Sequence, residues 1–177
     1  MTVKSSQART ILITILIITL VPLGRPLERI FSPIFYKYYP VSLIVCSLPF
    51  LYYALLFLMA LLRSLKNNGM QVINAAAILA FLLTLFIAFK SDHKIELIHI
   101  LLYSTVGYQA TNWLSKSAQP SLSFSAAFYS AALAVFDEIL QGIHPERIFD
   151  VRDILLNCSS AIMGIAYYSM ASSSKSS

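Results

Sequence analysis

One stretch of the chain, from Phe136 to Asn157, holds five of its eight acidic residues. The five are Asp137, Glu138, Glu146, Asp150 and Asp153, and Arg147 and Arg152 stand among them. Carboxylates can pair with arginine, transfer protons or hold a metal, and an arginine can grip a phosphate with two parallel hydrogen bonds. Upstream, His99 adds an imidazole whose charge changes near physiological pH. The chemistry of the chain is expected in these residues.

The sequence leaves the role of Glu138 open. Glu138 and Asp137 fall in the last turn of a predicted helix, where the helix dipole disfavours anions, so a nearby cation such as Arg147 or Arg152 is expected to offset them. In one interpretation these groups form a structural ion-pair network that locks two helices together. In the other, Glu138 and His99 act on a bound headgroup, and Arg147 holds a carboxylate or a phosphate.

Helical spacing places polar and small residues on one face of each of three predicted helices. The first face comprises Glu96, His99, Tyr103, Gly107 and Ala110; the second comprises Ala134, Asp137 and Gln141, with Glu138 beside it; the third comprises Asp153, Asn157, Ser160, Gly164 and Tyr168. Polar groups near one end, with small residues further along, are typical of close helix packing in lipid. We therefore expect the three faces to meet.

The order of these helices brings their polar ends to one membrane surface. Ile95–Trp113 begins there, Leu122–Leu140 ends there, and Val151–Met170 begins there. At 1.5 Å per residue, His99 lies roughly 6 Å and Asn157 roughly 9 Å inside its own helix. Because a charge costs less near the interface than at mid-bilayer, this favours a shallow cup that recognises something at the surface over a proton relay through the midplane. The candidate catalytic residues are Glu138 and His99, and the candidate binding residues are Glu96, Tyr103, Asp137, Gln141, Arg147, Asp153 and Asn157.

Some of these residues have a simpler interpretation. Asp150 directly precedes an apolar run and is expected to be a helix N-cap, with Asp153 also favoured by the helix dipole. Asp153 shares a face with Asn157, so capping and ligand binding both stay open for it. Glu96 and His99 form one Glu-x-x-His pair, whereas di-iron bundles use two such pairs with further glutamates. We assign no metal site, and the sequence indicates no particular cofactor.

Composition favours a membrane protein. Of the 177 residues, 58% are hydrophobic and 12% are charged, and the mean hydropathy is +0.72. A soluble domain is about 45–50% apolar and about 25% charged. The net charge of +5 comes without a basic stripe, an aromatic platform or zinc-ligand spacing, so we exclude nucleic-acid binding. The Lys and Arg residues divide almost evenly between the two predicted sides, so they do not set the orientation in the membrane.

The expected fold is all-α, a polytopic helical membrane bundle with about six transmembrane helices, because only helices or closed barrels satisfy the backbone in lipid. The apolar segments are Thr10–Gly24, Val41–Leu62, Val72–Phe89, Ile95–Trp113, Leu122–Leu140 and Val151–Met170. Residues 25–40, rich in Arg, Lys and Tyr, are expected to lie at the interface. We expect a single transmembrane domain over 1–170, with the motifs in 95–170 and a disordered tail at 171–177.

One set of motifs resembles a known family. The pattern E-x-x-Q-x-x-x-P-x-R-x-x-D-x-x-D-x-x-x-N-x-x-x-x-x-x-G, from Glu138 to Gly164, is preceded by H-x-x-x-Y, from His99 to Tyr103. In combination these motifs resemble the VanZ-like membrane proteins. The resemblance runs from Glu96 to Gly164, and the first half of the chain shares only hydropathy. The chain departs from the family pattern at Ser160, where the family usually has Gly, and at Glu96, where it often has Lys.

The resemblance implies a multi-span protein of the cell membrane and cell envelope, since the namesake of the family is linked to teicoplanin resistance. It implies no mechanism, and three functions stay open. The first is binding of a lipid, lipid-linked or anionic headgroup through the cup, with an influence on glycopeptide susceptibility. The second is an intramembrane hydrolase or transferase in which Glu138 is the general base and His99 the acid, or both hold a metal. The third is an assembly factor with an architectural ion-pair network.

Overall fold

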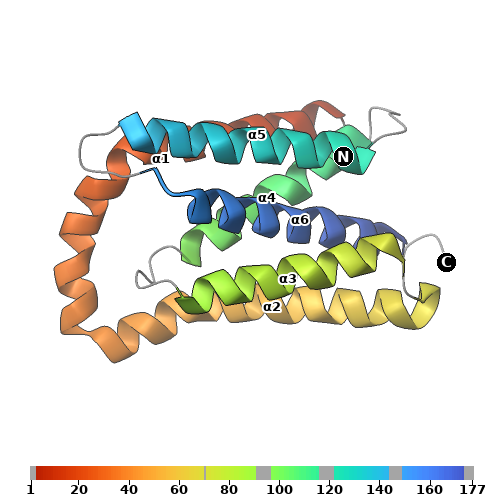
Figure 1. Ribbon diagram of the computed structural model, residues 1–177, viewed down its shortest axis with the longest axis horizontal. Helices are drawn as coiled ribbons and strands as arrows, with labels where there is room; N and C mark the ends of the chain where they lie inside the picture. Colours follow the sequence, from red (N-terminus) through yellow and green to blue (C-terminus); the bar gives the residue numbers. More distant parts are fainter. Residues whose placement is uncertain (1–2, 70, 91–96, 116–121, 144–148, 174–177) are drawn as a thin grey trace.

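The computed structural model describes residues 3–69, 71–90, 97–115, 122–143 and 149–173. Within these ranges the chain forms α-helices and no strand, as predicted. The helices are α1 (Val3–Lys37), α2 (Tyr39–Asn68), α3 (Val72–Lys90), α4 (Leu97–Leu114), α5 (Leu122–Ile143) and α6 (Val151–Ser173). Apart from the second half of α1, they run back and forth along the bundle, so α1 begins and α6 ends at the same end (Figure 1).

Four of the described helices are long and apolar enough to cross a membrane. The candidate spans are Ser47–Asn67, Val72–Lys90, Phe124–Ile143 and Val151–Ser172. Each exceeds the roughly 17 residues that a crossing requires at 1.5 Å per residue. The structure therefore confirms a helical membrane bundle, in which four of the six or so expected spans stand out by composition.

α1 differs from the prediction of a short apolar segment followed by a separate interfacial one. It is one helix of 35 residues, Val3–Lys37. Its second half, drawn in orange in Figure 1, turns and runs across the end of the bundle at a large angle to α2 and α3. Pro26 and Pro33 lie in this half. Each removes a backbone donor and so permits a helix to bend. The predicted interfacial segment is thus a continuation of α1.

α6 lies at the centre of the bundle and packs against α3, α4 and α5 (Figure 1). Within its candidate span 56% of the residues are buried, against 17% in that of α2. The helix also extends to Ser173, which includes the first residues of the expected tail. The remainder of that tail, 174–177, lies outside the described residues. The central position of α6 explains why the polar groups on it are enclosed by protein.

Two glycines allow α4 and α6 to cross at close range. A Cβ at Gly107 would overlap the backbone carbonyl of Ala161, and a Cβ at Gly164 would overlap that of Ser104. Small residues let helix backbones approach closely in lipid. These two glycines therefore fix the separation of α4 and α6, and with it the geometry of the polar residues that the two helices carry.

Candidate functional site

The three predicted polar faces meet at one end of the bundle. α4 and α6 begin at this end, and α5 finishes there (Figure 1). All three pairs among these helices are in contact. The end is the one that the second half of α1 crosses. The connections at 91–96 and 144–148, which include the candidate residues Glu96 and Arg147, lie outside the described residues.

A buried hydrogen bond links α4 to α5. The phenol of Tyr103 donates to a carboxylate oxygen of Asp137 at 2.9 Å. Tyr103 is fully buried and Asp137 is 2% exposed. A hydrogen bond to a charged partner contributes about 1.5–3 kcal/mol, more than a neutral one. The bond therefore gives Asp137 a partner in an apolar bundle, where an unpaired carboxylate would be costly.

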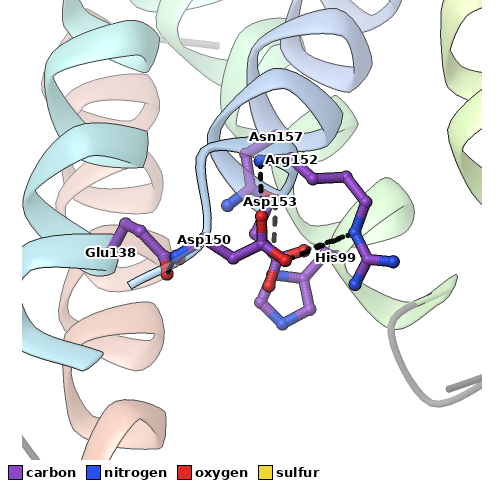
Figure 2. A network of polar contacts seen from close by, with 6 residues as sticks. All are labelled: His99, Glu138, Asp150, Arg152, Asp153 and Asn157. Atoms are coloured by element: carbon purple, nitrogen blue, oxygen red, sulfur yellow. Dashed lines mark hydrogen bonds and ion pairs between the residues drawn. The ribbon is translucent and has the colours of Figure 1, made fainter. Parts of the chain in front are cut away.

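Glu138, the next residue of α5, reaches α6. Its Oε1 accepts a hydrogen bond of 2.6 Å from the backbone N–H of Asp150 (Figure 2). The side chain is completely buried. Within the described part of the chain, its second oxygen, Oε2, has no hydrogen-bond partner. One oxygen thus holds the start of α6, and the other is buried without a hydrogen-bond partner among the described residues.

Asp150 caps α6 as predicted. Its Oδ1 accepts a hydrogen bond of 2.8 Å from the backbone N–H of Arg152, and its carbonyl accepts one of 3.0 Å from Asp153. These contacts satisfy donors that every helix leaves free at its first turn. The Nε of Arg152 lies 3.5 Å from Asp150 and 3.7 Å from Asp153. These partly exposed ion pairs contribute little to stability on their own.

His99 and Asn157 join α4 to α6. The His99 Nδ1 and the Asn157 Oδ1 are 3.2 Å apart, which is hydrogen-bond distance (Figure 2). The imidazole also stacks on the ring of Tyr103, with 6.4 Å between centroids and 9° between planes. Asn157 is completely buried. In the described residues its Nδ2 has no partner, so one end of this amide is unpaired whichever way the amide is turned.

The structure therefore brings together most of the residues that the sequence selected. Tyr103, Asp137, Glu138, Gln141 and Asn157 are buried, while His99 and Asp153 are half-buried. The five buried side chains are enclosed by the neighbouring helices. Two contacts were not anticipated, namely the Tyr103 hydroxyl as the partner of Asp137 and the Asp150 N–H as the partner of Glu138. The contact between Tyr103 and Asp137 could have been predicted by comparing how far each residue lies from the shared end of α4 and α5.

A further cross-helix contact lies outside the predicted set. The hydroxyls of Thr84 on α3 and Ser159 on α6 are 2.8 Å apart, and both residues are buried. Buried hydroxyls commonly form such hydrogen bonds between helices in lipid. The described residues contain no group of three or more His, Cys, Asp or Glu side chains able to hold a metal ion. The contacts between helices are hydrogen bonds, whereas the ion pairs of Arg152 lie at the start of α6.

Comparison with protein families identifies the family of the chain. A sequence profile described as VanZ/LLP1 matches residues 9–172. The chain belongs to the VanZ/LLP1 family. The match extends the motif resemblance, which ran from Glu96 to Gly164, across nearly the whole chain, so the first half shares more with the family than hydropathy. The family and the candidate spans together make the chain a VanZ-like multi-pass membrane protein.

Neither a search of curated proteins nor a search of solved structures finds a match. The VanZ/LLP1 match covers all the helices that build the site, α4, α5 and α6, up to Ser172. Inferences about the chemistry of this VanZ-like protein therefore rest on its own contacts.

Proposed function

We propose that this VanZ-like protein binds the headgroup of a lipid or a lipid-linked molecule of the cell envelope, and thereby influences susceptibility to glycopeptides such as teicoplanin. The binding site is the group of polar side chains at the shared end of α4, α5 and α6. Its membrane is the cell membrane. The chain from 1 to 170 acts as one transmembrane domain.

The observation that carries the proposal is the unsatisfied Oε2 of Glu138. A buried polar atom without a partner costs about 1–3 kcal/mol, and more when it is charged. Buried polar groups without partners are rare in native proteins, so each requires an explanation. Glu138 lies five residues before Ile143, the last residue of α5, and is therefore roughly 8 Å from that helix end. That depth is within reach of a headgroup and short of the bilayer midplane.

The architectural alternative also has an observation in its favour. Glu138 uses Oε1 to hold the N–H of Asp150, and Asp137 is held by Tyr103. Both contacts tie neighbouring helices together, so both would be present in a purely structural network. The difference lies in Oε2, which a structural network would be expected to satisfy as well.

The contacts give less support to acid–base chemistry by Glu138 and His99. Glu138 contacts Asp150, just before α6, and His99 contacts Asn157 within α6 (Figure 2). These partners are seven positions apart, which is roughly 10 Å at the rise of an α-helix. A general acid and base that act on one headgroup must both reach its reacting atoms. A binding role asks only that each side chain contact some part of the ligand.

The test is a susceptibility measurement in a teicoplanin-sensitive bacterial host. We compare wild type, Glu138→Gln and an empty vector, with membrane abundance measured for each. Gln keeps an oxygen for the Asp150 N–H, but it places an NH₂ donor where Oε2 was. The proposal expects wild type to raise the inhibitory concentration of teicoplanin above that of the empty vector. Glu138→Gln at equal abundance should give no such increase.

The matched control is Ser130→Ala. Ser130 is also a buried polar residue of α5, and among the described residues its hydroxyl bonds within its own helix, to the carbonyl of Ala126 at 2.8 Å. We expect it to retain the wild-type effect. If Glu138→Gln lowers the amount of folded protein, and the inhibitory concentration falls only in proportion, the architectural function would be favoured. An inhibitory concentration with wild type equal to that of the vector would refute the link to glycopeptides.

A further inference from the structure

The charges around Glu138 restrict the ligand that could satisfy it. Four carboxylates gather at this end of the described helices, those of Asp137, Glu138, Asp150 and Asp153. Those of Asp153, Asp137 and Asp150 are close enough to act electrostatically on Glu138. Like charges in one site repel, and an incoming anion would add to the repulsion.

Two cations described near this end, Arg152 and Lys90, have identified contacts. The Nε of Arg152 lies between the carboxylates of Asp150 and Asp153. Lys90, at the end of α3, places its Nζ 4.9 Å from the centroid of the Phe86 ring on its own helix. The charged groups described as acting on Glu138 are the carboxylates of Asp153, Asp137 and Asp150, so its immediate environment is acidic. Such an environment favours a ligand that carries positive charge.

The unsatisfied atoms specify the hydrogen-bonding character of the ligand. An ionised carboxylate only accepts hydrogen bonds, so Oε2 of Glu138 requires a donor. Oε2 is fully covered by protein, so the group that reaches it must be small and terminal, such as an ammonium or a hydroxyl. The acidic surroundings favour the ammonium over the hydroxyl, because the ammonium adds charge attraction to the hydrogen bond.

We infer that the group recognised by Glu138 is the primary ammonium of a lipid headgroup, of the kind carried by ethanolamine or by an aminoacyl ester. This inference rests on the proposed function and narrows its ligand from any headgroup to an amine-bearing one. A quaternary ammonium carries the same charge without an N–H, so it cannot donate to Oε2. The recognition is therefore sensitive to methylation of the nitrogen and not to charge alone.

The experiment compares three lipids by native mass spectrometry of the detergent-purified protein. The probes are phosphatidylethanolamine, phosphatidylcholine and phosphatidylglycerol of identical acyl chains, each added at the same molar ratio. Phosphatidylcholine tests charge without an N–H donor, and phosphatidylglycerol tests an anionic headgroup with hydroxyls. A hydrogen bond between charged partners is worth about 1.5–3 kcal/mol, which corresponds to about tenfold or more in affinity. We expect phosphatidylethanolamine to be retained about tenfold more than either of the others.

Variants assign the preference to the site. We expect Glu138→Gln to lose the tenfold preference for phosphatidylethanolamine and Ser130→Ala to keep it. Equal retention of phosphatidylethanolamine and phosphatidylcholine would overturn the inference, even if Glu138→Gln does not fold. Stronger retention of phosphatidylglycerol would overturn it while leaving headgroup binding intact. Retention of none of the three would count against both the inference and the proposed function.

Free ethanolamine distinguishes a lipid from a soluble amine. If the ligand is a lipid headgroup, millimolar ethanolamine should leave the retained phosphatidylethanolamine unchanged, because the acyl chains contribute most of the binding free energy. Displacement of the lipid by ethanolamine alone would show that the site takes a soluble amine and would overturn the assignment to a lipid.

Discussion

Tyr103 and Asp137, on adjacent helices, form a hydrogen bond of 2.9 Å that is almost entirely shielded from solvent. The bond also fixes the ring on which His99 stacks. A single phenol thus supports both an acidic residue of α5 and the histidine of α4, which makes it the most informative position for a stability test.

Tyr103→Phe should destabilise the protein by about 1–3 kcal/mol, because Asp137 is left buried without its hydroxyl donor. The free energy of unfolding in detergent, from a denaturant titration, provides the measurement. Tyr52→Phe is the control, since Tyr52 is 65% exposed on α2. If both variants unfold like wild type, the Tyr103 bond is not a stabilising contact.

Gly164→Ala should weaken the bundle more than a typical surface change, because the new Cβ would collide with the backbone carbonyl of Ser104. Overpacking of this kind costs typically about 1–3 kcal/mol. Gly142→Ala is a milder comparison, since the nearest atom to its Cβ would be in the side chain of Phe149, at 3.2 Å. The fraction of monodisperse protein after heating reports the difference. Equal thermal stability of the two variants would contradict the close crossing of α4 and α6.

Asp150→Ala should cost about 0.5–2 kcal/mol through loss of the N-cap of α6, whereas Asp150→Asn should retain most of the stability because its side-chain oxygen can still accept from Arg152. Hydrogen exchange of the amides in the first turn of α6 gives a local measurement. Faster exchange in the Ala variant alone is the expected result. Equal protection in both variants would show that the cap does not depend on the side chain.

Thr84→Val should have a smaller effect, about 0.6 kcal/mol, the average for hydrogen bonds between helices in a membrane protein. Ser159 retains a hydrogen bond to the carbonyl of Leu156 when its bond to Thr84 is lost. The same denaturant titration compares this variant with Tyr103→Phe. A loss as large as that of Tyr103→Phe would mean that the α3–α6 contact carries more of the stability than its chemistry indicates.

The helical faces were predictable because the 3.6-residue period fixes which residues share a face, whatever the partner. His99 and Tyr103 on one face, and Asn157 and Gly164 on another, therefore lie where the spacing placed them. The individual partners depend on how far one helix is shifted along its neighbour, and a single sequence does not contain that shift.

The partners of Arg152 illustrate this limit. The sequence offered Arg147 or Arg152 as the offset for Asp137 and Glu138. Arg147 lies outside the described residues, and two ion pairs of Arg152 are with Asp150 and Asp153 at the start of α6. The continuity of α1 was missed for a related reason, since prolines within a helix can bend it without ending it.

α4 is central in space, yet it is absent from the helices that composition marks as membrane spans. Its buried Ser104 and Thr111 face protein only after the bundle has closed. A ribosome synthesises this helix before α5 and α6, two of the helices against which it packs. During biogenesis α4 therefore precedes two of its packing partners, and its buried polar groups gain their protein surroundings only when α5 and α6 follow.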